Sequence, residues 1–293
     1  NREDNIAVFL STDMSRKGVY RWDDAREPVY VPDCLLPILH GEYGEDGSIQ
    51  GIFKYAGIPY IGPGIMSSAA SIDKAITKRL VRDLGLMQAD YLEFKLETGD
   101  VKAQCEEIAS YFINRYPIFV KPANAGSSIG VSKVSSASEI RDAVSEAYKH
   151  HNKIVVEEGI SGREIEVAVL ERRDGELIAS RIGEIVSVDR FYSFDEKYKD
   201  SVKTKVGICD DLSDEIVCEI QEQAKAVFKV LECKGLSRVD FFYTDDGEIC
   251  FNEINTMPGF TEHSMYPKLI MDKGISYSEL ITTLVDGAIK DFE

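Results

Sequence analysis

The chain has 293 residues, of which 44% are hydrophobic and 29% are charged, a balance that is normal for a globular protein of two or three domains. Its formal net charge of −17 leaves no general surplus of lysine and arginine, which argues against binding to duplex nucleic acid. A nucleotide needs only a few local cations, so the charge does not exclude one. No run of about 18 apolar residues is present, and we therefore expect no membrane-spanning segment.

Cysteine usage and the first residues favour a cytoplasmic protein. The cysteines form no Cys-x-x-Cys pair and have no histidine at ligand spacing; they are Cys34, Cys105, Cys209, Cys218, Cys233 and Cys250. This scatter predicts thiols in a reducing compartment rather than a disulfide framework or a zinc site. Residues 1–5 carry no hydrophobic signal-peptide core.

Strands and helices alternate in the first part of the chain. Short buried-type strands are predicted at residues 6–10, 34–39 and 59–61, with a helix over 48–56. This alternation is typical of a wound parallel sheet. A second helix is predicted over residues 68–84, with Asp73 and Lys74 in its middle.

The remainder of the chain is richer in strands. Strands are predicted at 118–122, 129–134, 153–158, 164–170 and 176–185, with helices at 138–150 and 214–231 and a polar, aromatic loop at 187–204. We expect an N-terminal domain over residues 1–75. The second domain, 76–293, would have a central lobe over about 76–160 and a C-terminal lobe over about 161–293.

A small-residue loop follows the strand that ends with Lys121. Gly126, Ser127 and Ser128 can present backbone N–H groups and hydroxyls to phosphate oxygens. The loop is not a Walker A motif, because no Gly-Lys-Ser/Thr closes it and a strand rather than a helix follows. An ordinary hairpin turn is the alternative interpretation of the same residues.

An acidic segment follows the next predicted strand. Backbone groups around Glu157 and Glu158 could meet the edge of an adenine ring, and the Glu164 carboxylate could accept hydrogen bonds from ribose hydroxyls. A solvated acidic surface is the alternative interpretation.

Two strands near the C-terminal end carry hard oxygen ligands. The side-chain alternation of a strand puts Arg238 and Asp240 on one face. Glu253 and Asn255 follow the same period on the next strand, after a predicted hairpin turn. Two carboxylates and an amide suit Mg²⁺ between protein and nucleotide phosphates better than zinc or iron. An exposed strand face with ordinary charges is the alternative.

The order of these motifs resembles the ATP-grasp fold and, within it, the D-alanine–D-alanine ligase family. The resemblance is carried by residues 40–47, 73–74, 121–128, 196–198, 238–240 and 252–261. It implies an α/β fold of the α+β ATP-grasp type, with an N-terminal wound parallel-sheet domain followed by a two-lobed ATP-grasp unit.

The resemblance also implies a role for each matching position. Cations that neutralise ATP phosphates would be Lys74, Lys121 and Lys197. The rest of the nucleotide site would comprise Ser128, Glu157, Glu158, Ile160, Glu164 and Phe251. The ligands of two Mg²⁺ ions, which Mn²⁺ could replace, would be Asp240, Glu253 and Asn255. Oxyanion stabilisation would come from Arg238 and the Gly259 backbone. The amino-acid subsites would contain His40, Ser127, Glu196, Tyr198, Ser264 and Met265.

The implied activity is an ATP-dependent ligase that joins D-alanine to a second D-amino acid through an acyl phosphate. Its product would serve peptidoglycan synthesis, and the protein would be a cytoplasmic homodimer with small-molecule substrates. The loop 187–204 would close over the site, although a mobile surface loop is the alternative. Two rivals remain: another ATP-grasp carboxylate–amine ligase and a non-catalytic nucleotide-binding module.

Two departures from the family pattern affect this interpretation. No Gly-Gly-x-Ser-x-Glu segment precedes His40, so we expect residues to be missing there, and the first-subsite glutamate is not assigned. The triplet that begins at Glu196 resembles D-alanine–D-serine ligases of vancomycin resistance, whereas Met265 stands where those enzymes tend to have arginine. The acceptor, D-alanine or D-serine, stays open, with D-alanine ahead as the commoner activity.

Overall fold

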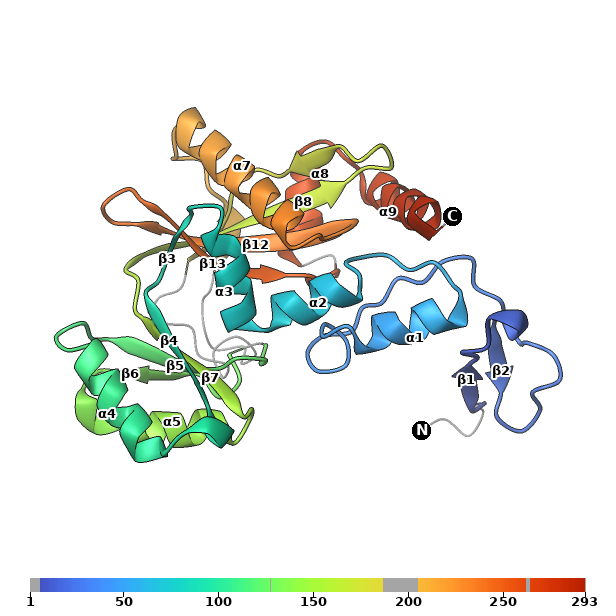
Figure 1. Cartoon of the computed structure of the whole chain (residues 1–293). Helices are drawn as coiled ribbons and strands as arrows, with labels where there is room; N and C mark the ends of the chain where they lie inside the picture. Colours follow the sequence, from blue (N-terminus) through green and yellow to red (C-terminus); the bar gives the residue numbers. More distant parts are fainter. Residues whose placement is uncertain (1–5, 127, 187–204, 262–263, 293) are drawn as a thin grey trace.

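The structure is a computed structural model that describes residues 6–126, 128–186, 205–261 and 264–292. Within these ranges the strands form three sheets, of two, four and seven strands. Figure 1 shows the four-stranded and seven-stranded sheets as two lobes with helix α3 between them, while the two-stranded sheet lies to one side. No helix in this described part is both long and apolar enough to cross a membrane.

The N-terminal region forms less sheet than the sequence predicts. Strand β1 (Val8–Leu10) pairs antiparallel with β2 (Val19–Arg21), on either side of the 3-10 turn η1 (Met14–Arg16). The predicted strands near Leu35 and Tyr60 meet only as a single parallel bridge. Because Pro37 and Pro59 flank these positions and lack an N–H donor, the pairing does not extend, and the predicted wound parallel sheet is reduced to this bridge in the described residues. The predicted helix α1 (Ser48–Ala56) is confirmed.

The helix predicted over residues 68–84 is two helices, α2 (Ile65–Ile72) and α3 (Lys74–Arg82). The backbone of Asp73 is extended, and its carboxylate accepts hydrogen bonds from two N–H groups of the next turn, at 3.1 Å each. Asp73 therefore ends one helix and caps the next, which corrects its predicted mid-helix position. Helix α3 touches both lobes, because Ala75 packs with residues of the four-stranded sheet and Val81 belongs to the core of the seven-stranded sheet.

The four-stranded sheet forms the central lobe. Its order is β4 (Tyr91–Lys95), β7 (Lys153–Glu158), β5 (Ile118–Pro122) and β6 (Ser132–Val134), and all pairs are antiparallel. Helices α4 (Val101–Tyr111) and α5 (Ile140–Tyr148) cover one face, where the buried core includes Ile108, Phe112, Val120, Ile154 and Val156. Because side chains alternate along a strand, the opposite face carries Lys121 and Glu157. Two 3-10 turns, η2 (Leu96–Thr98) and η3 (Ala137–Glu139), precede the helices.

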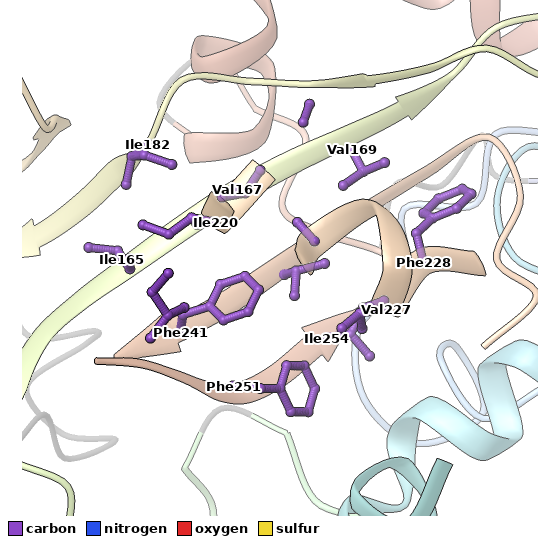
Figure 2. Packing of buried hydrophobic residues seen from close by; sticks show 14 of the residues in the cluster. Ile165, Val167, Val169, Ile182, Ile220, Val227, Phe228, Phe241, Phe251 and Ile254 are labelled. Atoms are coloured by element: carbon purple, nitrogen blue, oxygen red, sulfur yellow. The ribbon is translucent and has the colours of Figure 1, made fainter. Parts of the chain in front are cut away.

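The seven-stranded sheet forms the C-terminal lobe. Its order is β11 (Lys205–Ile208), β10 (Gly183–Val186), β8 (Gly162–Glu171), β12 (Leu236–Thr244), β13 (Ile249–Asn255) and β3 (Met87–Gln88), with β9 (Leu177–Ala179) beside β8. Helix α7 (Asp214–Val230) covers one face, and Figure 2 shows the apolar side chains that pack there. Helices α8 (Met265–Asp272) and α9 (Tyr277–Phe292) pack on residues of the other face, such as Ala168 and Leu170. The strand predicted over 176–185 is thus divided into β9 and β10.

A β-bulge in the β12–β13 hairpin determines which side chains point to the face opposite helix α7. Asp240 pairs with Glu253, but the next residue of β12, Phe241, pairs with Phe251, so Asn252 is the extra residue. The extra residue reverses the alternation. Glu253 therefore shares a face with Asp240, whereas Phe251 turns into the core against Phe241, with ring centroids 6.0 Å apart.

Candidate active site

Arg238, Asp240 and Asn255 form one hydrogen-bonded group on the hairpin. Arg238 lies opposite Asn255 in the register, and Asp240 lies opposite Glu253, which confirms the predicted shared face. The Arg238 guanidinium donates to both Asp240 oxygens, at 2.8 and 2.7 Å, and the Asn255 amide nitrogen donates to Asp240 Oδ2 at 2.9 Å. This fork fixes both side chains of β12 in one geometry.

The donor set of this face fits a hard divalent cation. No group of three or more His, Cys, Asp or Glu side chains suited to a metal occurs in the described ranges. The hairpin instead offers two carboxylates, Asp240 and Glu253, and the amide of Asn255, whose oxygen is not used by its bond to Asp240. Oxygen donors of this kind suit Mg²⁺, whereas a structural zinc site would require thiolate or imidazole ligands.

Cations of the central lobe gather around one buried carboxylate. Glu157 Oε2 accepts a hydrogen bond from Lys121 Nζ at 2.6 Å, and Lys78 Nζ lies 3.4 Å from Glu157 Oε1. Lys74 interacts electrostatically with Glu157 and with Glu253 of the other lobe. Three ammonium groups around one carboxylate leave a local surplus of positive charge in an acidic chain, which suits a polyphosphate.

The pKa values of this group follow from burial and from the ion pairs. Burial alone would raise the pKa of Glu157, but Lys121 and Lys78 lower it to about 2. Burial would likewise lower the pKa of Lys121, yet the attraction of Glu157 leaves it raised. For Lys74 burial prevails, and its pKa is lowered although Glu253 acts in the opposite direction.

The backbone and the side chain of Lys74 both donate hydrogen bonds to the loop after β5. Its backbone N–H donates to Ala123 O at 3.0 Å, and its ammonium donates to Ala125 O at 2.7 Å. The preceding residue, Asp73, forms a buried ion pair with Lys153 of β7, whose Nζ lies 2.8 and 2.9 Å from the two carboxylate oxygens. The start of α3 is thereby fixed against the small-residue loop that follows β5.

A small cavity joins the two groups. It has a volume of about 50 Å³, and its lining includes Lys74, Gly126, Glu253, Asn255 and Glu45. A larger cavity of about 820 Å³ lies elsewhere, between α2, α7 and neighbouring loops, and shares none of these side chains. We assign the candidate site to the small cavity, because Glu253 and Asn255 of the hairpin line it together with Lys74 of α3 and Gly126 of the loop after β5.

Three charged residues of this region were not singled out from the sequence. Glu45 accepts a hydrogen bond from Gly41 N at 2.5 Å, and burial raises its pKa. Lys78 lies four residues after Lys74 on α3, a spacing that predicts a shared helix face. Glu166 lies two residues after Glu164 on β8, so strand alternation would have placed it on the site face.

The other predicted residues differ in how close they lie to this cavity. Glu164 acts electrostatically on Lys121 across the two lobes. Glu158 points to the opposite face from Glu157 and accepts a hydrogen bond from Asp90 N at 2.9 Å. Ile160, half-buried, follows β7, and Phe251 is fully buried in the α7 core, away from the site face.

The remaining predicted residues lie on separate segments of the chain. A Cβ atom at Gly259 would lie 2.8 Å from Ser264 Oγ, so the backbone there passes close to the start of α8. Met265 is buried, whereas His40 is exposed and acts electrostatically on Glu45. Ser128 has a left-handed backbone with φ of 60°. Four predicted residues lie outside the described ranges: Ser127, Glu196, Lys197 and Tyr198.

Comparisons with known proteins show which family the chain is similar to. Residues 4–63 match the family model described as D-ala D-ala ligase N-terminus, and residues 80–286 match D-ala D-ala ligase C-terminus. The D-alanine–D-alanine ligase of Acetivibrio thermocellus is 46% identical over 263 residues, which are 89% of this chain and 69% of that protein.

Two solved structures are similar over nearly the whole chain. The VanG D-Ala:D-Ser ligase of Enterococcus faecalis has a TM-score of 0.85 at 38% identity, covering 97% of this chain and 79% of that one. The D-alanyl-alanine synthetase A of Vibrio cholerae has a TM-score of 0.87 at 32% identity, covering 98% of this chain and 84% of that one.

The lowered pKa of Glu157 predicts a pH-dependent contribution to stability. A carboxylate whose pKa falls from 4.5 unfolded to about 2 folded stabilises the protein fully above about pH 4.5. That contribution is lost as the pH falls towards 2. Glu157→Gln should therefore lower the free energy of unfolding by about 3–5 kcal/mol at pH 7, because it leaves buried lysines unpaired. Urea unfolding of both proteins should give a smaller difference at pH 3.5 than at pH 7; a difference independent of pH would contradict the assignment.

Proposed function

The chain belongs to the D-alanine–D-alanine ligase family, and we propose that it joins two D-alanine molecules, with ATP, to supply peptidoglycan precursors. Membership confirms the predicted fold class, an α/β ATP-grasp protein, and the predicted activity class, an ATP-dependent ligase that requires a divalent metal. The observation that carries the proposal is the register of β12 and β13, which sets Arg238 and Asp240 against Asn255 and Glu253.

ATP would lie between the two lobes. Lys74 and Lys121 would contact its phosphates, together with Lys197, and Glu157 and Glu164 would approach the adenine and ribose. The support for this placement is the surplus of ammonium groups around Glu157 and the electrostatic contact of Lys121 with Glu164. Ser128, Glu158 and Ile160 remain nucleotide contacts in the proposal, through the backbone in the case of Glu158.

Asp240, Glu253 and Asn255 would hold two Mg²⁺ ions, which Mn²⁺ could replace. When bound, the metal offsets the negative charge of the phosphates during phosphoryl transfer. The protein supplies the remaining positive charge from Lys74 and Lys121, which are held before substrate arrives.

The chemistry follows from the reluctance of a carboxylate to react with an amine. The first D-alanine carboxylate would attack the γ-phosphorus of ATP, releasing ADP and forming an acyl phosphate. The amine of the second D-alanine would then attack the acyl carbon, and phosphate would leave. The oxyanion formed in that step would lie against the Arg238 guanidinium and the Gly259 N–H.

The amino-acid subsites would be lined by residues from several segments of the chain. They are His40, Ser127, Tyr198, Ser264 and Met265. A homodimer in the cytoplasm is also proposed, and it is supported by family membership alone.

A D-serine acceptor is the second candidate. It is favoured by the Glu196-Lys197-Tyr198 triplet and by the similarity to the VanG D-Ala:D-Ser ligase. The Glu196 carboxylate could accept a hydrogen bond from the hydroxyl group of D-serine, which D-alanine lacks, and would thereby select D-serine. The apolar Met265 offers no polar partner to the second amino acid, and D-alanine therefore stays the first candidate.

Product analysis with D-alanine and D-serine supplied together tests the proposal. We expect D-alanyl-D-alanine to be the main dipeptide by mass spectrometry, with ADP and phosphate formed in equal amounts. Mainly D-alanyl-D-serine would transfer the assignment to the second candidate. ATP binding without any dipeptide would contradict both.

Replacing Arg238 tests its role against the oxyanion. Arg238→Ala should lower kcat for dipeptide formation by about 10²–10³, as does loss of an oxyanion donor elsewhere, while ATP still binds. Arg238→Lys serves as the control that retains charge but not the planar fork, and it should recover part of the rate. Full activity in Arg238→Ala would exclude the role.

Replacing Glu196 tests acceptor choice. If its carboxylate accepts a hydrogen bond from the serine hydroxyl, Glu196→Ala should lower kcat/KM for D-serine more than for D-alanine, by about tenfold. The measurement is the ratio of the two dipeptides formed in competition. A ratio equal to that of the wild type would remove Glu196 as a determinant.

A further inference from the structure

Arg238 lies between two carboxylates on the site face of the seven-stranded sheet. Besides its fork to Asp240, its Nη2 lies 3.2 Å from Oε1 of Glu166 on β8. Asp240 and Glu166 are direct cross-strand partners in the β12–β8 register. The Glu166 side chain is only 4% exposed and that of Arg238 is 21% exposed, so the pair is screened from water. Opposite charges that are screened from water attract each other strongly.

Asp240 and Glu166 have different roles in the proposed site. Asp240 belongs to the metal-binding set, whereas Glu166 does not. In the present arrangement both Asp240 oxygens accept hydrogen bonds from Arg238. A divalent cation at Asp240 would therefore meet the positive charge of the guanidinium at the same carboxylate, where Oδ2 already accepts two hydrogen bonds, from Arg238 and from Asn255.

Release of Arg238 from Asp240 would be unfavourable if no second anion were present, because a half-buried guanidinium would then lose its partner. Glu166 already lies within ion-pair distance of the same Nη2 atom, so Arg238 can retain one carboxylate while Asp240 turns towards the cation. The Arg238 guanidinium would then stay on the site face of the hairpin.

We propose that Glu166 is a positioning residue that holds Arg238 at the reaction centre when Asp240 exchanges the guanidinium for a divalent metal. The inference rests on the proposed function, in which Asp240 binds the metal and Arg238 faces the oxyanion. Its consequence is specific: without the Glu166 charge, Arg238 remains on Asp240 and opposes metal binding.

The test is a double-mutant cycle read by Mn²⁺ binding to the enzyme without nucleotide, followed by the electron paramagnetic resonance signal of free Mn²⁺. Glu166→Gln should weaken Mn²⁺ binding by about 10-fold to 100-fold, as other outer-sphere substitutions do. Glu166→Asp keeps the charge on a shorter side chain, and its Mn²⁺ affinity should therefore lie between those of the wild type and of Glu166→Gln. In the Arg238→Ala background, Glu166→Gln should have much less effect, because no guanidinium is left to oppose the metal.

A matched control is Glu184→Gln on neighbouring strand β10. Glu184 forms a similar fork with Arg163, at 2.7 and 2.6 Å, but its strand partner is the core residue Ile165, so it belongs to the other face. This control should leave Mn²⁺ binding unchanged. Thermal unfolding of each variant separates loss of metal binding from loss of fold.

Two results would overturn the proposal: Mn²⁺ binding to folded Glu166→Gln and Glu166→Asp that equals the wild type, or an equal loss with and without Arg238. The second result would mean that Glu166 attracts the metal by its charge alone. Failure of the wild type to form dipeptide would contradict the proposed function instead, since the metal titration reads the Glu166–Arg238 coupling without substrates.

Discussion

The candidate site depends on the pairing of β12 with β13. The register and the bulge at Asn252 put two acidic side chains, one amide and one guanidinium on a single face, while Phe241 and Phe251 stay in the α7 core. A one-residue change in this pairing would exchange the two sets and bury the charges among apolar side chains. The hairpin thus links the stability of the C-terminal lobe to the chemistry of the site, because the same register determines both.

The central lobe contributes the opposite charge. Its sheet turns Lys121 and Glu157 away from the α4–α5 core, and α3 adds Lys74 and Lys78 from the other side. The buried pair of Asp73 with Lys153 fixes the start of α3 on this sheet, 80 residues away in sequence. Because these cations are held by backbone and carboxylate contacts, a polyphosphate would meet a site whose side chains need little reorganisation.

Strand periodicity is a local property, and it therefore predicts from sequence that Arg238 shares a face with Asp240. The bulge that turns Phe251 to the core depends on pairing with another strand and has no local signal. The helical pattern likewise continues through Asp73, where only the cap separates α2 from α3. The contact of Lys153 with Asp73 depends on how α3 packs on the four-stranded sheet. Lys78 and Glu166 were missed, although their spacing from Lys74 and Glu164 could have predicted them.

The most direct test of the account is a crystal structure with Mg²⁺ and a non-hydrolysable ATP analogue. We expect metal density between Asp240, Glu253 and Asn255, and a triphosphate that extends from it to Lys74 and Lys121. A nucleotide bound instead in the cavity of about 820 Å³ beside α2 and α7, with no metal on the hairpin, would contradict the account.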